Sequence, residues 1–382
     1  MSIKYKARVS KRQEKGKSKN TLRAYKSDWL KFIDYCENSQ DLAVTNDNIN
    51  PKNIKNIDDA YALTINYLTW LYDEKDPEAK GKYKKGKSEL DHRKNHNNNP
   101  YSIPSSSVYN EEYKASTIQR KLASIVYNFK LLGWKLDRKS AALSETMSGF
   151  MTDENINKKN KAKGLLSRDI KTIIDKIDEN EQLNKRDIRD KSLILLCFFS
   201  FCRRSEIINL RANEIKKNDD GGINITITKS KTDQKSEGRE IYIGETNDKY
   251  CPVKALYNWL KIAEINNDND SCPLFFKINK GNKIEKKSIS INKNEEIRYT
   301  GLTDTRFVNI LKKRAEDAGY SKNDIKNISG HSLRIGAISQ AKKDGFSNDE
   351  IMKITGHKTE QMITEYTQIS SEDMKKSKLK KF

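Results

Sequence analysis

The chain has 382 residues, of which 74 are Lys or Arg and 53 are Asp or Glu, giving a formal net charge of +21. A chain of this length can form two or three domains with their own cores, and we expect two. The charge excess favours nucleic acid as a partner, although a lysine-rich background composition would raise it too. The sequence has no run of about 18 apolar residues and no apolar signal-peptide core, so it predicts neither a membrane-spanning nor a secreted protein.

The cysteines and histidines do not suggest a metal site. The five cysteines are odd in number and lack paired metal-ligand spacing, so we interpret them as reduced thiols. His92 and His96 have a ligand-like gap, but no second pair lies near them in their Asn- and Lys-rich stretch. We therefore predict no zinc site there.

The first part of the chain predicts an all-α domain over residues 20–152. Residues 1–19 show no apolar periodicity and predict a flexible basic arm. Apolar residues then recur at helical spacing, and the expected helices run from Asn20, over 58–73 with Asp58 as cap, from Ser116 as cap, and over about 140–151. The hydrophilic segment 74–113 is rich in turn-forming residues and predicts an insertion or long loop.

The second part predicts a mixed α+β domain over residues 165–382. Residues 153–164 are charged and nearly lack apolar side chains, which is typical of a linker. Beyond it we expect helices after a Ser167 cap, over the apolar run 193–201, and over 251–263, 303–318 and 331 to the end, with strands at 223–227 and 241–243 joined by a polar loop. The fold class is therefore mainly α, with a small antiparallel sheet in the second domain.

Two patches combine arginine with residues that can bind an anion. His331 and Arg334 are three residues apart, so on a helix they share a face and can grip one phosphate together; an exposed helix start is the alternative. Arg203 follows an apolar helix, where a guanidinium needs an anion or a carboxylate such as Glu206. A purely structural Arg–Glu pair is the alternative there.

A third patch, TGHKTEQMITEYTQ at 355–368, contains His357 and Tyr366. Most of the 17 tyrosines are expected to be packing residues. His357 precedes Tyr366 by nine residues, and on one unbroken helix they would lie on opposite faces roughly 13 Å apart. Gly356 and the polar residues 358–360 instead predict a turn followed by a new helix.

The order R-x-x-E, a hairpin Lys, H-x-x-R, His or Trp, and then Tyr resembles that of the tyrosine recombinases, which include phage integrases and Cre recombinase. The matching positions in this chain are Arg203 with Glu206, Lys231, His331 with Arg334, His357, and Tyr366 as the nucleophile. The resemblance covers about residues 18–370, because NTLRAYKSDWLKFIDYC and STIQRKLASI are similar to the helical core-binding domain of Cre-like members. Segment 74–113 is longer than in those members, and Lys229 competes with Lys231 for the lysine role.

The resemblance implies DNA strand cleavage and rejoining through a 3′-phosphotyrosyl bond to Tyr366. It implies that Arg203 and Arg334 bind the nonbridging phosphate oxygens, that Lys231 protonates the leaving 5′-oxygen, and that His331 assists proton removal from Tyr366. His357 would then hydrogen-bond the phosphate, and Glu206 would orient its neighbours. The sequence shows neither the acidic triad of a two-metal nuclease nor a Walker phosphate loop, so no metal, ATP or other cofactor is implied.

As partners, the resemblance implies double-stranded DNA with inverted-repeat sites, clamped between the two domains, and a homotetramer on two sites. The C-terminal tail 370–382, which includes KKSKLKKF, would dock onto a neighbouring protomer or form a frayed basic end. Localisation would be the cytoplasm and nucleoid in a bacterium or phage, or the nucleus in a eukaryote or its virus. The alternatives are a telomere resolvase, a type IB topoisomerase and a DNA-binding protein with a decayed active site.

Overall fold

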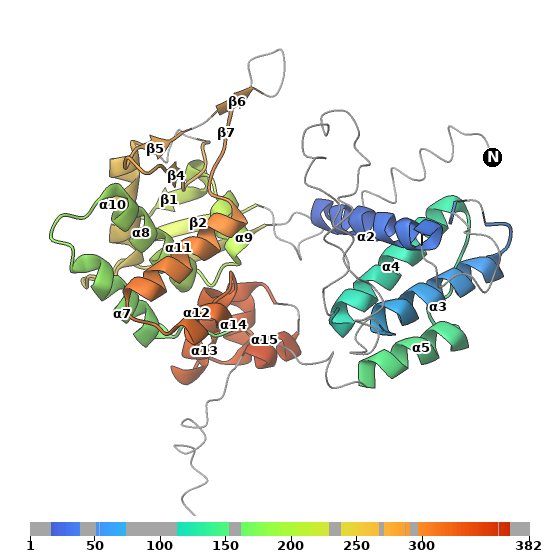
Figure 1. Cartoon of the computed structure of the whole chain (residues 1–382). Helices are drawn as coiled ribbons and strands as arrows, with labels where there is room; N and C mark the ends of the chain where they lie inside the picture. The colour runs from blue at the N-terminus through green and yellow to red at the C-terminus, as the bar shows by residue number, and fades with distance from the viewer. Residues whose placement is uncertain are drawn as a thin grey trace, which may run out of the picture. The chain divides into compact units, whose positions relative to one another are not determined.

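The computed structural model describes residues 17–38, 51–52, 54–73, 113–152, 162–228, 238–266, 271–286, 288–290, 297–357 and 359–366. The chain divides into two compact units, Met1–Lys159 and Asn160–Phe382 (Figure 1). This division falls within 153–164, the segment that the sequence predicts as a linker. Among the described residues, no helix is long and apolar enough to cross a membrane.

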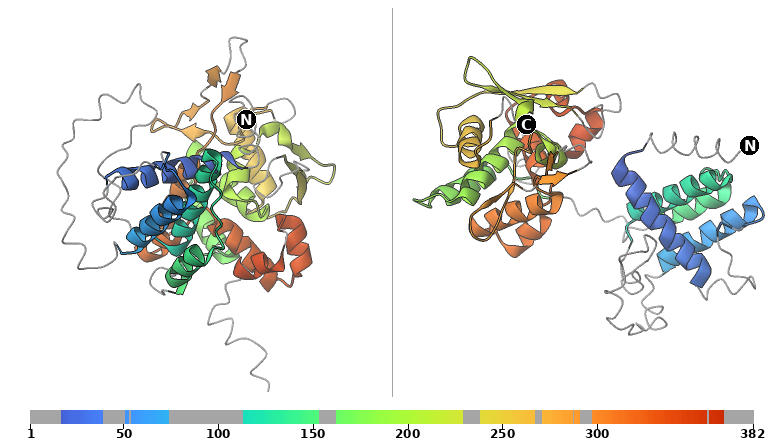
Figure 2. Two further views of the ribbon diagram at one scale, coloured as in Figure 1. Left: turned by 90° about the vertical axis from the view of Figure 1, so that its right-hand side faces the viewer. Right: turned by 90° about the horizontal axis from the view of Figure 1, so that it is seen from above.

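The first unit contains four described helices, which pack against one another in both views of Figure 2. They are α2 (Lys19–Asn38), α3 (Ile57–Asp73), α4 (Ala115–Leu132) and α5 (Ala141–Thr152). Helix α4 packs against α2 and α3, and α3 also packs against α5. Aromatic rings fill the centre: Phe32 meets both Tyr67 and Phe129 edge-on, with ring centroids 5.2 and 5.9 Å apart.

The second unit is also mainly helical, with three small antiparallel sheets, so the predicted fold class is confirmed. Its helices are α7 (Ser167–Asp178), α8 (Lys185–Phe199), α9 (Arg204–Asn209), α10 (Pro252–Ala263), α11 (Asp304–Asp317), α12 (Lys322–Asn327), α13 (Ser332–Lys343), α14 (Asn348–Thr355) and α15 (Glu360–Tyr366). Its sheets are β1 (Ile215–Lys217), β2 (Ile223–Ile227) and β3 (Arg239–Ile243) in that order, β4 (Lys277–Ile278) with β5 (Ile284–Glu285), and β6 (Ser288–Ser290) with β7 (Ile297–Tyr299).

The predicted helix caps Asp58, Ser116 and Ser167 are wrong by one or two residues. Each of these residues lies inside the first turn of its helix, whereas a capping residue must precede the helix. The side chain of Asn56 instead accepts the backbone N–H of Asp59 at 2.8 Å. The N-cap positions of α4 and α7 are Lys114 and Leu166, which are not preferred capping residues, so the rule that a helix starts after Ser, Thr, Asp or Asn misplaced their first residues.

Helix α8 is the centre of the second unit. Its residues 192–198 are all buried, and it packs against α7, α10, α11 and α13. The predicted helix over 193–201 ends early, since Ser200 caps α8 and Phe201 has a left-handed backbone with φ 54°. That conformation is costly for a residue with a side chain, and it turns the chain sharply into Arg203 and α9.

Strands β2 and β3 pair over their full length. Ile223, Ile225 and Ile227 alternate into the core, as the sequence predicts, and Ile227 lies opposite Arg239 at the end of the pair. The loop that joins the strands, residues 229–237, lies outside the described residues. The register therefore holds Arg239 where β3 begins, directly after that loop.

A close backbone contact fixes α13. The N–H of Leu165 donates to the carbonyl of Ser332 at 3.0 Å, and the chain before α7 crosses α13 at Gly336. A Cβ atom on Gly336 would lie 1.7 Å from the carbonyl oxygen of Leu165. Only glycine permits this approach, and it positions the helix that carries Arg334.

We predict that Gly336→Ala lowers the free energy of unfolding by about 1–3 kcal/mol or more, because the added methyl group must displace the main chain of Leu165. Gly149 in α5 has no heavy atom within 4 Å of the same added Cβ. Gly149→Ala should therefore leave stability unchanged or raise it by up to about 1 kcal/mol. Urea unfolding monitored by circular dichroism measures the free energy of unfolding of both variants. A Gly336→Ala protein as stable as wild type would contradict the predicted clash.

Candidate active site

Three segments that are distant in the sequence converge in the second unit. These segments form three regions of the unit: the turn from α8 into α9, the start of β3, and the helix pair α13–α14, which contributes the start of α13 and the end of α14. Together they place two hydrogen-bonded groups, Arg203–Glu206–Arg239 and Arg334–His357, at the end of α14, where Arg239 and Arg334 donate to adjacent backbone carbonyls. We call these five residues the cationic cluster. Helices α13, α14 and α15 form the red group beneath α11 in Figure 1.

Arg203 and Glu206 form the pair that the sequence suggested. Arg203 is the N-cap of α9, and its backbone N–H donates to Glu206 Oε2 at 2.9 Å. Its guanidinium also donates from Nη1 to Oε1 at 2.9 Å. The Glu206 side chain is only 2% exposed, so the pair is held by the helix start rather than by a surface contact.

Arg239 is a member of the cluster that the sequence did not single out. Its Nη2 donates to Glu206 Oε2 at 2.9 Å, and its Nη1 donates to the carbonyl of Ile354 at 2.5 Å. It therefore links β3 to the end of α14. In the sequence, Arg239 stands directly after the polar loop of the predicted hairpin. No motif distinguishes it there from the other polar residues near that loop.

Glu206 stays ionised between these two arginines. Burial alone would raise its pKa, but the charge of Arg239 and the hydrogen bonds from Arg203 outweigh burial, and the pKa lies below its ordinary value. A carboxylate with both oxygens engaged keeps the two guanidiniums in place.

Arg334 is almost completely buried, at 1% exposure, in the first turn of α13. Its Nη1 donates to the carbonyl of Phe201 at 2.6 Å, and its Nη2 donates to the carbonyl of Thr355 at 2.9 Å. His331, three residues earlier, is the N-cap of the same helix and is exposed. The two residues of the H-x-x-R pattern thus lie on one helix end but in different surroundings.

His357 lies in the turn that the sequence predicted. Helix α14 ends at Thr355, Gly356 follows with φ 68°, and α15 begins at Glu360. The ring of His357 contacts Arg334 Nη2 through Nε2 at 3.0 Å and Thr355 Oγ1 through Nδ1 at 2.8 Å. Burial, followed by the charges of Arg334 and Arg203, lowers the pKa of His357 to about 4, so the ring is neutral near pH 7.

The remaining predicted residues are placed only in part. Tyr366 is the last residue of α15, and its side chain lies outside the described part of the structure. Lys231 and its competitor Lys229 are in the undescribed loop 229–237. The described contacts therefore join Arg203, Arg334, His357 and Glu206, and they leave the positions of the nucleophile and the lysine as predictions.

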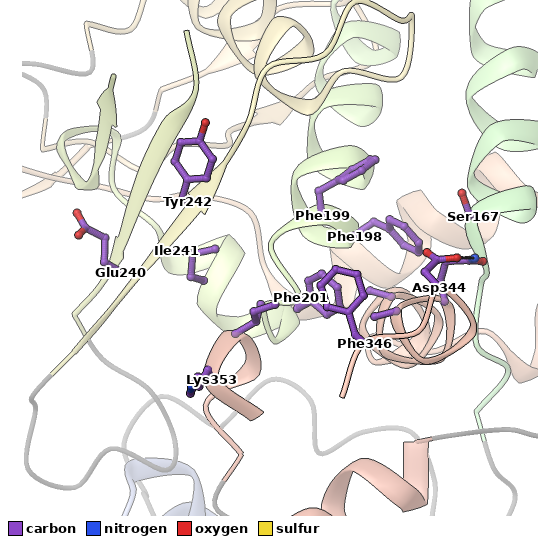
Figure 3. A pocket seen from close by; sticks show the side chains of 14 residues that line it. Ser167, Phe198, Phe199, Phe201, Glu240, Ile241, Tyr242, Asp344, Phe346 and Lys353 are labelled. Carbon is purple, nitrogen blue, oxygen red and sulfur yellow. Dashed lines mark hydrogen bonds between the residues drawn. The ribbon is translucent and has the colours of Figure 1, made fainter. Parts of the chain in front are cut away.

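An apolar groove of about 550 Å³ lies beside the cluster. Figure 3 shows Phe198, Phe201 and Phe346 close together in it. Phe346 is 43% exposed, and Glu240 and Asp344 add acidic groups to its lining. Exposed aromatic side chains gathered in a groove are typical of a protein contact surface.

Comparison with known proteins identifies the family. The phage integrase family matches residues 163–373, which is more than half of the chain. The chain is 26% identical over 363 residues to the "Integrase/recombinase xerD homolog" of Selenomonas ruminantium, covering 94% of this chain and 84% of that protein.

Solved structures of low sequence identity were also found. One is XerA recombinase, with a TM-score of 0.40, 14% identity, and coverage of 98% of this chain and 96% of that chain. Another is a lambda integrase dimer bound to a COC′ core site, with a TM-score of 0.48, 12% identity, and coverage of 98% and 77%. On the family match over residues 163–373, this chain belongs to the phage integrase family of tyrosine-type site-specific recombinases.

Proposed function

We propose that this protein recombines double-stranded DNA at specific sites through a covalent 3′-phosphotyrosyl bond to Tyr366, without ATP or metal. The observation that carries the proposal is the composition of the cationic cluster. The cluster contains three guanidiniums, a neutral histidine and one carboxylate, Glu206, so the named groups have an excess of positive charge. A DNA phosphate supplies the negative charge that balances it. One member of the cluster, His357, also lies in the turn directly before α15, the helix that ends with Tyr366.

In the proposed reaction, Arg203 and Arg334 donate hydrogen bonds to the nonbridging oxygens of the scissile phosphate. The phenolic oxygen of Tyr366 forms a bond to phosphorus while the bond from phosphorus to the 5′-oxygen breaks. Lys231 gives that 5′-oxygen a proton, and His331 takes the proton of Tyr366. Attack of a 5′-hydroxyl on the phosphotyrosyl bond then reverses these steps, and no external energy source is needed because the bond energy is retained.

Two further residues, Glu206 and Arg239, position the phosphate-binding groups in this scheme. Glu206 orients Arg203 through its two contacts with that residue. Arg239, which we add to the predicted set, holds Glu206 from the other side and fixes the end of α14 ahead of His357. His357 donates a hydrogen bond to the phosphate.

The proposed assembly assigns DNA contact to both units. Residues 20–152 act as a core-binding domain with an insertion at 74–113, residues 1–19 form a basic arm, and residues 165–382 form the catalytic domain; the two clamp inverted-repeat DNA. The protein therefore works where its host keeps DNA, in the bacterial nucleoid or in a nucleus.

We also propose a tetramer on two sites, in which the tail 370–382 of one protomer occupies the apolar groove of the next. The support for this occupant is chemical, since the tail combines five lysines with Leu379 and Phe382, and the groove combines aromatic and acidic side chains.

The first test is covalent trapping on nicked suicide DNA that carries candidate sites from the genetic neighbourhood of the protein. Wild type should give a denaturation-resistant protein–DNA band, and Tyr366→Phe should give none, because the nucleophilic oxygen is gone. Tyr299→Phe is the matched control. Tyr299 is exposed, its ring packs on Phe276, and the control should trap DNA as wild type does.

The pattern of bands separates the alternatives. A band that persists in Tyr366→Phe would show that another residue is the nucleophile. Absence of any wild-type band on all sites tested would favour the decayed DNA-binding protein. If a band forms, strand exchange between paired sites distinguishes a recombinase from a telomere resolvase or a topoisomerase.

The groove gives a second prediction. Phe346→Asp places a charge among the aromatic rings and should abolish the tetramer on paired sites, as measured by mass photometry, while a protomer still binds a single half-site with unchanged affinity. Phe346→Leu, which stays apolar, is the control and should still assemble. Tetramers of normal abundance with Phe346→Asp would exclude this groove as the contact.

A further inference from the structure

Thr355, the last residue of α14, contacts both Arg334 and His357. Its carbonyl oxygen accepts a hydrogen bond from Arg334 Nη2 at 2.9 Å, and its hydroxyl oxygen lies 2.8 Å from His357 Nδ1. The same hydroxyl donates to the carbonyl of Ile351 at 2.6 Å. The Thr355 residue is fully buried, at 0% exposure, so these contacts are made without competition from bulk water.

The positions of the hydrogens follow from the partners. A guanidinium can only donate, so His357 Nε2 must accept from Arg334 and carries no proton in this structure. A neutral ring then has its proton on Nδ1, which donates to Thr355 Oγ1. The hydroxyl proton of Thr355 is directed at Ile351, so the arrangement is consistent from Arg334 to the helix backbone.

The Nδ1–H tautomer does not allow His357 to play its proposed role as a hydrogen-bond donor to the phosphate. To donate a hydrogen bond to a phosphate oxygen, Nε2 must carry the proton. Nδ1 then becomes an acceptor and needs a donor in place of its present acceptor. A hydroxyl group can serve as the acceptor for Nδ1–H or as the donor to a bare Nδ1, because it has one proton to donate and lone pairs that accept.

We propose that Thr355 is a positioning residue that allows His357 to exchange tautomers when DNA binds. This rests on the proposed function. In the DNA-free protein, Nδ1–H donates to Thr355 and Nε2 accepts from Arg334. When a phosphate takes the Arg334 hydrogen bond, a transient local opening of this buried site admits water. Water then gives Nε2 a proton and takes one from Nδ1, so the charge of the ring is unchanged. The Thr355 hydroxyl turns from Ile351 to Nδ1, and Nε2–H donates to the phosphate.

The kinetic test compares Thr355→Val, which keeps the shape of the side chain but has no hydroxyl, with Thr355→Ser, which keeps the hydroxyl. Both retain the backbone carbonyl that holds Arg334. On saturating suicide DNA, Thr355→Val should form the covalent product about 10-fold more slowly, the effect expected for one lost hydrogen bond. Thr355→Ser should remain within about 2-fold of wild type, and DNA affinity should change by less than about 2-fold in both variants.

The spectroscopic test reads the tautomer itself. The full chain with ¹⁵N-labelled histidine contains four histidines, and His357→Gln assigns the signal of interest. Long-range ¹H–¹⁵N correlation should show Nδ1–H for His357 without DNA and Nε2–H in complex with DNA, measured in the Tyr366→Phe background to prevent cleavage. Thr355→Val should lose the Nε2–H form on DNA, and Thr355→Ser should keep it.

The outcomes are distinct. Equal cleavage rates for Thr355→Val and wild type, equal losses for Thr355→Val and Thr355→Ser, or an Nδ1–H ring in the DNA complex would each overturn the proposal. If wild type forms no Tyr366-dependent product, the proposed function fails first and the catalytic role of Thr355 fails with it. An Nε2–H ring in the DNA-free protein would refute the tautomer assignment independently of any activity.

Discussion

The paired salt bridges of the buried Glu206 carboxylate, with Arg203 and Arg239, are the interaction on which the arrangement of the cationic cluster depends. The carboxylate joins Arg203 at the start of α9 to Arg239 at the start of β3, and Arg239 in turn reaches the end of α14. One acid thus connects a helix, a sheet and the helix end that precedes His357. Removing the acid would leave two partly buried guanidiniums without their shared partner, and the loss of one member of a buried ion pair costs about 3–5 kcal/mol.

Arg334 is stabilised by different means. Its described partners include the carbonyls of Phe201, just beyond α8, and Thr355, the last residue of α14. The carbonyl groups at the C-terminal ends of helices carry partial negative charge, and they favour a cation without neutralising it. The two carbonyls therefore hold the guanidinium in place without neutralising its charge. The strained backbone of Phe201 is a cost of bringing one of these carbonyls to the arginine.

The sequence predicted the longer helices, strand β2 and most of the cluster, because these leave local patterns, but it missed the short helices α9 and α12. Helical periodicity located α2 through α5, alternating isoleucines located β2, and the motif order located Arg203, Arg334 and His357. Arg239 and Thr355 were not found, because their contacts are with residues brought near only by the fold: Arg239 with Ile354, and Thr355 with Arg334. The short strands β1 and β4 to β7 were missed for a related reason, since two or three residues contain too little alternation to be recognised.

Helix α15 is held by a hydrophobic cluster separate from the main core of its unit. Among its described side chains, Ile363 is buried, and it packs with Ile338, Ala341 and Ile351. Burying one isoleucine contributes about 1.5–3 kcal/mol, so local unfolding of this single short helix requires far less free energy than unfolding the unit. The helix that ends with Tyr366 therefore depends on its own small hydrophobic cluster, so a substitution within that cluster weakens the packing of this helix while most of the main core stays intact.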